Sequence, residues 1–217
     1  MILSGDPDVR TIVFASLRFS LCSTILASLI GVPAGVALAS AHFRFKHFVE
    51  DLLNTMLAIP TVVVGLFCYT LLFSQGPLGG FRLLFSPAAI IFGQTVLILP
   101  LIASLACSAV SMINPVVQET ARTLGAGGFR TTITVAAEAH GALLVACLTG
   151  FGRVVGEIGI SLLLGGNILG YTRTITTAIS LETSKGEFAQ GLALGIVLLC
   201  AAFGINIAAR LIRRKSR

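Results

Sequence analysis

Five long apolar segments constrain the fold of this chain more than any other feature. They lie near residues 12–41, 48–74, 88–112, 141–164 and 188–212. Each is long enough to cross about 30 Å of hydrocarbon, which takes about 20 helical residues. Only a helix satisfies every backbone polar group within such a segment. The sequence therefore predicts an all-α integral membrane protein with about five transmembrane helices, forming a single domain over residues 1–217.

The low proportion of charged residues separates the chain from soluble proteins. Only 11% of its residues are charged, whereas a soluble domain has about a quarter. The net charge of +6 comes largely from a cluster after the last apolar segment: Arg210, Arg213, Arg214, Lys215 and Arg217. Basic residues there hold a helix end at the lipid surface on the cytoplasmic side. The sequence offers no folded basic face, so we expect no nucleic-acid partner.

The distribution of Lys and Arg predicts the orientation of the chain. Five crossings place the two termini on opposite sides of the membrane. If the C-terminus is cytoplasmic, the cytoplasmic segments hold nine of these residues and the outer segments hold four. Cytoplasmic loops carry the excess of positive charge. We therefore expect the N-terminus outside, the C-terminus in the cytoplasm, and the polar loop 113–140 in the cytoplasm.

The sequence of this loop predicts two short helices joined by a glycine turn. Asn114 followed by Pro115 is typical of a helix start. Val117, Ala121 and Leu124 are then expected on one face, and the glycines at 125, 127 and 128 end the helix. A second amphipathic helix is expected from about residue 129 to 137. Such a shape suits either a knob for a soluble partner or an ordinary interfacial loop.

Two stretches carry a resemblance to a known family. Glu119, Ala121 and Gly125 match the EAA motif of permease subunits from ATP-binding cassette (ABC) importers, E-A-A-x3-G-x9-I-x-L-P. The chain departs from the motif at Thr120 and Val135, and its Leu-Pro is replaced by Ala-Glu at 137–138. Residues 150–180, GFGRVVGEIGISLLLGGNILGYTRTITTAIS, resemble the molybdate/sulfate-type permeases, most closely the tungstate importer permeases.

The resemblance implies the fold of an ABC type I importer transmembrane domain in a bacterial or archaeal plasma (inner) membrane. It also implies a homodimer, a cytoplasmic ABC ATPase and an extracytoplasmic substrate-binding protein as partners. The EAA loop would form the coupling helix that docks on the ATPase, with Glu119, Ala121 and Gly125 as the matching residues. Arg122 can make a similar contact, although the family pattern does not require it.

The sequence predicts no catalysis by the chain itself. It contains no GxxxxGK[ST] stretch for nucleotide phosphates, so ATP is expected on the partner ATPase and no cofactor on this chain. No spacing typical of a metal site or a catalytic nucleophile occurs either. We therefore predict a non-catalytic subunit. The resemblance implies that this subunit imports an oxyanion; tungstate is our first hypothesis, and molybdate and sulfate are the alternatives.

Charged and polar residues in and after the fourth segment are candidates for the transport path. Arg153 and Glu157 lie four residues apart, and a charge inside the bilayer costs about 2.5–3.5 kcal/mol on translocon scales. The pair can serve transport or act as a structural ion pair, and the sequence leaves both open. A polar group expected at the outer mouth follows, made up of Asn167, Thr172, Arg173 and Thr174; it suits an oxyanion, the binding protein or a plain loop.

Two other functional classes are compatible with part of the pattern. An ion-coupled secondary transporter often has internal repeats and carboxylates deep in the membrane, but this sequence shows no repeat and Glu157 is its only deep acid. A membrane scaffold without transport would have no use for the glycine-broken loop. An ATPase gene next to the gene for this chain would favour the importer over both of these classes.

Overall fold

The computed structural model describes residues 7–41 and 43–215, and Arg217 of the predicted basic cluster lies outside them. Within these residues the chain is helical and has no β-strand, as predicted. The elements are α1 (Pro7–Ser40), α2 (Lys46–Leu57), α3 (Thr61–Leu72), η1 (Gly79–Phe81), α4 (Pro87–Ser111), α5 (Pro115–Thr123), α6 (Gly128–Glu138), α7 (His140–Val155), α8 (Gly159–Gly165), α9 (Ile175–Ser184) and α10 (Phe188–Lys215).

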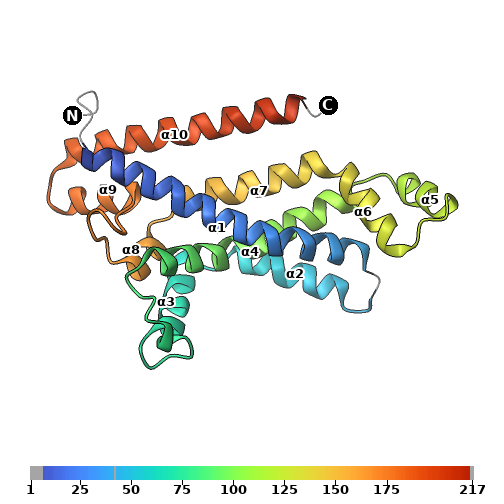
Figure 1. Cartoon of the computed structure of the whole chain (residues 1–217), viewed down its shortest axis with the longest axis horizontal. Helices are drawn as coiled ribbons and strands as arrows, with labels where there is room; N and C mark the ends of the chain where they lie inside the picture. Colours follow the sequence, from blue (N-terminus) through green and yellow to red (C-terminus); the bar gives the residue numbers. More distant parts are fainter. Residues whose placement is uncertain (1–6, 42, 216–217) are drawn as a thin grey trace.

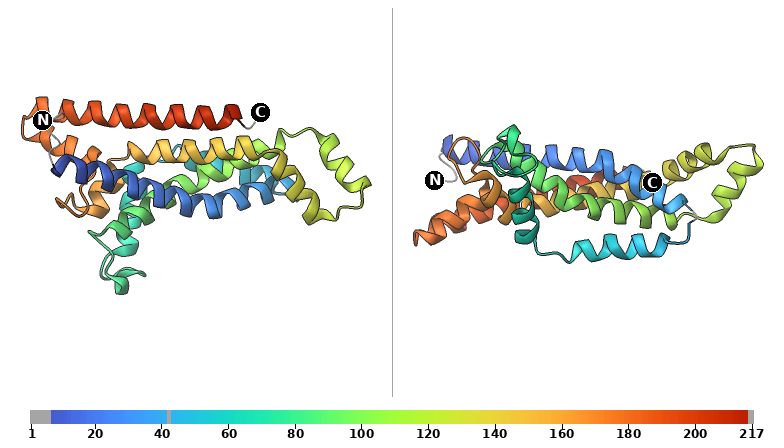
Figure 2. Two further views of the ribbon diagram at one scale, coloured as in Figure 1. Left: turned by 45° about the horizontal axis from the view of Figure 1, so that its top comes forward. Right: turned by 90° about the horizontal axis from the view of Figure 1, so that it is seen from below.

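The helices form an elongated bundle (Figure 1). Helices α1, α4, α7 and α10 run along its length, with the α5–α6 hairpin at one end and α8 and α9 toward the other. The views in Figure 2 show the same arrangement and the hairpin extending beyond the bundle. Among the described residues, α1 from Asp8 and α4 are each long and apolar enough to cross a membrane unbroken.

Close contact between α1 and α4 forms the centre of the bundle. A Cβ on Gly35 would lie 2.3 Å from the carbonyl oxygen of Ala103, so only glycine allows the two backbones to approach this far. The Ser23 hydroxyl donates to Gln94 Oε1 at 2.9 Å, which satisfies two polar groups that are almost fully buried. Small side chains and one polar contact therefore fix how these helices cross.

The second predicted segment, 48–74, is not one helix. It is divided into α2 and α3, which are bent by 98° relative to each other. Pro60 precedes the first residue of α3, and the residue before a proline is disfavoured in the helical region. Pro33 and Pro100 remain inside α1 and α4. The presence of a proline in an apolar segment therefore does not by itself determine whether a helix ends there.

The fourth predicted segment, 141–164, is also divided. Helix α7 ends at Val155, and α8 begins at Gly159. At its other end, α7 meets α6 at a bend of 69°. A further short helix, α9, lies between the fourth and fifth predicted segments and was not predicted.

Candidate functional site

The hairpin of α5 and α6 begins as the sequence predicts. Asn114 Oδ1 accepts a hydrogen bond from the backbone nitrogen of Val116 at 3.0 Å, and Pro115 occupies the first turn. The side chain thereby satisfies one of the amides that a helix start leaves without a partner. Helix α5 then ends at Thr123, and Leu124 forms its C-cap.

Gly125 makes the turn between the two helices. Its φ is +85°, in the left-handed region that favours glycine. The turn is closed by a hydrogen bond from the Ala126 nitrogen to the Ala121 oxygen at 3.0 Å, which satisfies a carbonyl at the helix end. A Cβ on Gly125 would meet nothing within 4 Å. The requirement for glycine here is therefore conformational rather than steric.

The base of the hairpin packs into the bundle. Val135 of α6, Val110 of α4 and Ala139 form a buried apolar cluster, against which Val117 packs. Val135 stands at the position of the isoleucine in the EAA motif, so a shorter apolar residue fills that place. The hairpin is thus fixed at its base to α4.

The tip of the hairpin exposes two large apolar side chains. Leu124 is 82% exposed and Phe129 is 79% exposed. Ala121 is buried on the expected face, but Leu124 does not share that face, because the helix ends just before it. Phe129 was not singled out from the sequence. Glu119 and Arg122 are exposed on α5.

Glu157 lies in the break between α7 and α8 rather than in a helix. Its Oε1 accepts hydrogen bonds from the backbone nitrogens of Gly159 at 2.9 Å and Ile160 at 3.4 Å. Thr176 of α9 donates to the Glu157 carbonyl oxygen at 2.9 Å. The side chain is 4% exposed, and a carboxylate is tolerated there because backbone donors surround it. Glu157 therefore ties α7, α8 and α9 together.

Arg153 has a different environment from Glu157, although the two form the predicted ion pair. Arg153 Nη1 lies 3.3 Å from Glu157 Oε2, and the Arg153 side chain is 46% exposed. Arg153 also lines a cavity of about 320 Å³ together with Met56 and Leu57 of α2 and Leu97 and Leu101 of α4. The guanidinium is thus the charged group of an otherwise mostly apolar cavity.

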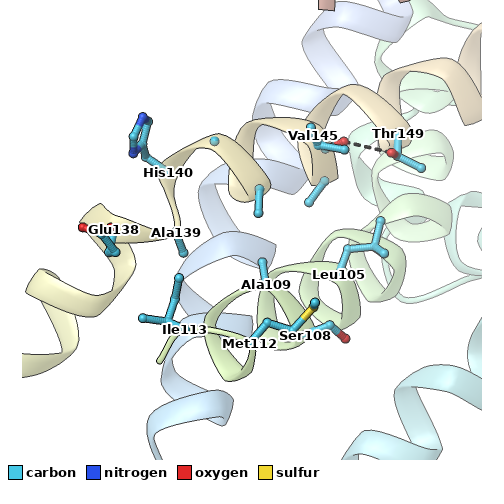
Figure 3. Close-up of a pocket in the computed structure, with 13 residues that line it drawn as sticks. Leu105, Ser108, Ala109, Met112, Ile113, Glu138, Ala139, His140, Val145 and Thr149 are labelled. Atoms are coloured by element: carbon cyan, nitrogen blue, oxygen red, sulfur yellow. Dashed lines mark hydrogen bonds between the residues drawn. The ribbon is translucent and has the colours of Figure 1, made fainter. Parts of the chain in front are cut away.

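A second cavity, of about 620 Å³, continues along α4 and α7 (Figure 3). Ser108 and Ala109 of α4 and Val145 of α7 are among its lining residues, and Thr149 lines both cavities. Glu138 and His140 also line the second cavity, at the end nearest the hairpin. We call the two cavities together the α4–α7 groove. Its lining runs from Arg153, near the end of α7, to Glu138 and Ala139, where α6 meets α7.

The loop from 166 to 174 holds the residues predicted at the outer mouth. Arg173 donates to the Asn167 side-chain oxygen at 3.1 Å and to its carbonyl oxygen at 3.3 Å. Both side chains are half-buried. Asn167 adopts a φ of +54°, a region that asparagine tolerates better than most residues. The two residues thus brace each other across the loop.

The two threonines of this group are buried and serve the loop itself. Thr172 donates to the Gly165 carbonyl oxygen and accepts from the Ile168 nitrogen. Thr174 is the N-cap of α9 and forms a capping box with Thr177. Their hydroxyls therefore have structural partners, which the sequence did not reveal.

Comparison of the sequence with known proteins identifies the family to which the chain belongs. The family model for "Binding-protein-dependent transport system inner membrane component" matches residues 31–217. The tungstate uptake system permease protein TupB of Campylobacter jejuni is 39% identical over 214 residues, covering 99% of this chain and 90% of that protein. The TupB of Peptoclostridium acidaminophilum is 35% identical over 206 residues, covering 95% and 90%.

Solved structures share the fold. An inward-facing MetNI methionine ABC transporter matches with a TM-score of 0.78 at 20% identity, covering 96% of this chain and 95% of that chain. The hairpin, the bundle and the sequence similarity over nearly the whole length lead to one assignment: this chain belongs to the family of inner-membrane permease components of binding-protein-dependent ABC importers.

Proposed function

We propose that this permease imports tungstate. The observation that carries the proposal is the similarity over 95–99% of the chain to two tungstate uptake permeases. Molybdate and sulfate are the alternatives, since the resemblance of residues 150–180 extends to permeases for those oxyanions. Membership of this family excludes a secondary transporter and a non-transporting scaffold. It implies that the chain is a non-catalytic subunit whose partners are an ATPase and a substrate-binding protein.

The proposed orientation places the α5–α6 hairpin in the cytoplasm and the N-terminus outside. Helix α1 starts at the end of the bundle that holds α9, and α10 runs toward the hairpin end (Figure 1). The hairpin and the 166–174 loop thus lie toward opposite ends. This arrangement agrees with the distribution of positive charge, which favours a cytoplasmic hairpin and C-terminus.

The proposed coupling element is the tip of the hairpin. Glu119 and Arg122 offer charges to the ATPase, and Leu124 and Phe129 offer apolar contact area. Exposed large apolar side chains at the end of a projecting element are typical of a docking site. Because Val135 and Ala139 pack against Val110 of α4, a displacement of the tip is transmitted to α4, and ATP on the partner ATPase drives it.

The proposed path follows the α4–α7 groove. Arg153 supplies a positive charge for the oxyanion, and Thr149 lies at the junction of the two cavities. Glu157 contacts Arg153 through one oxygen at 3.3 Å, and the half-exposed guanidinium keeps other N–H donors for the oxyanion. A homodimer would enclose the groove between two copies, since a single bundle of this size is too small to surround a path.

The test uses proteoliposomes that contain the permease, its ATPase and its binding protein. Binding protein loaded with tungstate should stimulate ATP hydrolysis and tungstate uptake, and binding protein loaded with molybdate or sulfate serves as the comparison. Stimulation by sulfate without stimulation by tungstate would show that the substrate assignment is wrong. Crosslinking across the α4–α7 groove tests the homodimer independently of the substrate.

A further inference from the structure

A third cavity, separate from the one that holds Arg153, lies where the hairpin joins the bundle. Its volume is about 460 Å³, within the usual range for ligand sites. Its walls come from the ends of α1 and α4 and the first residue of α2 on one side, and from α5 and α6 on the other. Among its described lining residues it shares none with the Arg153 cavity, and it shares Ile113 with the second cavity of the α4–α7 groove. Its principal polar residues are Ser40, Lys46, Ser111, Gln118, Arg122 and Thr132.

The charge of this cavity is uniformly positive. Lys46 and Arg122 line it, and none of its described lining residues is Asp or Glu. Neither cation takes part in an ion pair among the residues that the structure describes. Glu50, one helical turn beyond Lys46, pairs instead with His47 at 3.2 Å. Two cations without a carboxylate partner favour an anion in the cavity.

Hydrogen-bond donors accompany the two cations. Lys46 Nζ donates to the Ala39 carbonyl oxygen at 2.7 Å, which fixes the ammonium at the end of α1 and leaves two of its three donors for a ligand. Asn114 uses its side-chain oxygen to cap α5, so its amide nitrogen is the group left to donate. The Gln118 amide adds further donors, whereas the Ser111 hydroxyl already hydrogen-bonds to Cys107.

We propose that this cavity binds a phosphate-like tetrahedral oxyanion group. A compact anion with several acceptor oxygens matches two cations and several neutral donors. The group can belong to a free inorganic anion or to the headgroup of an anionic phospholipid. An occupant would contact α1 and the hairpin together, and it would therefore hold the hairpin in one position relative to the bundle. The inference does not depend on which substrate the permease imports.

The experiment measures binding to the full-length permease without its ATPase, because Arg122 is also a proposed ATPase contact. In detergent, equilibrium dialysis with radiolabelled inorganic phosphate tests for the free anion. In nanodiscs of mixed phosphatidylglycerol and phosphatidylcholine, native mass spectrometry counts the phosphatidylglycerol retained after extraction. Lys46→Gln and Arg122→Gln each remove one cation from the cavity. Arg44→Gln and Arg130→Gln make the same charge change at exposed positions that do not line it.

We expect Lys46→Gln and Arg122→Gln each to weaken binding about tenfold, the usual value of one charge-assisted hydrogen bond, while the two controls bind as the wild type does. A loss confined to phosphate identifies a free anion, and a loss confined to phosphatidylglycerol identifies a lipid. Equal binding by the wild type and by both cavity variants in both arms overturns the proposal. If Lys46→Gln does not fold, Arg122→Gln decides alone, because Arg122 is exposed on α5.

Discussion

The carboxylate of Glu157 lies 2.9 Å from the backbone nitrogen of Gly159, and this contact supports the start of α8 directly after α7 has ended. One acid thereby replaces the backbone acceptor that a continuous helix would have supplied. Its other oxygen faces Arg153. The break in the fourth apolar segment is therefore held by a side chain that also orients the positive charge of the groove.

Replacing Glu157 should reveal its structural role. Glu157→Ala leaves the half-buried amide of Gly159 and the buried amide of Ile160 without this acceptor, and we expect a loss of about 3 kcal/mol in the free energy of unfolding. Glu157→Gln keeps an acceptor oxygen and should lose clearly less. Unfolding of the detergent-purified protein, followed by circular dichroism, measures both. Equal losses for the two variants would contradict the capping role.

Replacing Arg153 should impair transport more than stability. Arg153→Gln removes the cation of the groove, and we expect tungstate uptake in proteoliposomes to fall about tenfold. Its ion pair with Glu157 is half-exposed, so the free energy of unfolding should fall by less than about 1 kcal/mol. Arg153→Lys should retain part of the uptake. Arg18→Gln is the matched control, because Arg18 is exposed on α1 and lines neither cavity of the groove. If Arg153→Gln takes up tungstate at the wild-type rate, Arg153 is not part of the path.

Gly125 and Gly127 offer a paired test of the turn. A Cβ would meet no neighbour within 4 Å at either position, but Gly125 has a φ of +85° and Gly127 a φ of −68°. Gly125→Val should therefore strain the turn by about 1–2 kcal/mol and reduce co-purification with the ATPase. Gly127→Val should leave co-purification unchanged. Similar behaviour of the two variants would mean that the left-handed turn does not matter for coupling.

The exposed tip of the hairpin should contribute to ATPase binding without contributing to stability. Leu124→Ser and Phe129→Ser alter side chains that contact solvent, so the melting temperature of the permease should stay within about 1 °C of the wild type. Affinity for the ATPase, measured by titration in detergent, should fall at least tenfold. Phe81→Ser is the control, since Phe81 is 71% exposed outside the hairpin. Unchanged affinity in both tip variants would place the contact elsewhere on the hairpin.

Much of the α5–α6 hairpin was predictable because its signals are local. Asn114 and Pro115 start a helix, and Gly125 ends it, through contacts with residues only a few positions away. The exposure of Leu124 was not predictable in the same way. It depends on where the helix stops relative to α6, and hydrophobic periodicity does not specify that position.

The sequence by itself determined the membrane class, the helical fold and the family, because long apolar segments admit only helices and because similarity to relatives extends over nearly the whole chain. Only the tertiary structure decided that Pro60 ends a helix while Pro33 and Pro100 do not, and that Glu157 caps α8 while Arg153 lines a cavity. The physical reason is that hydropathy records how long a segment is, whereas its direction and the partners of its polar groups depend on helices distant in the sequence. Thr176 of α9, which holds the Glu157 carbonyl, is one such partner.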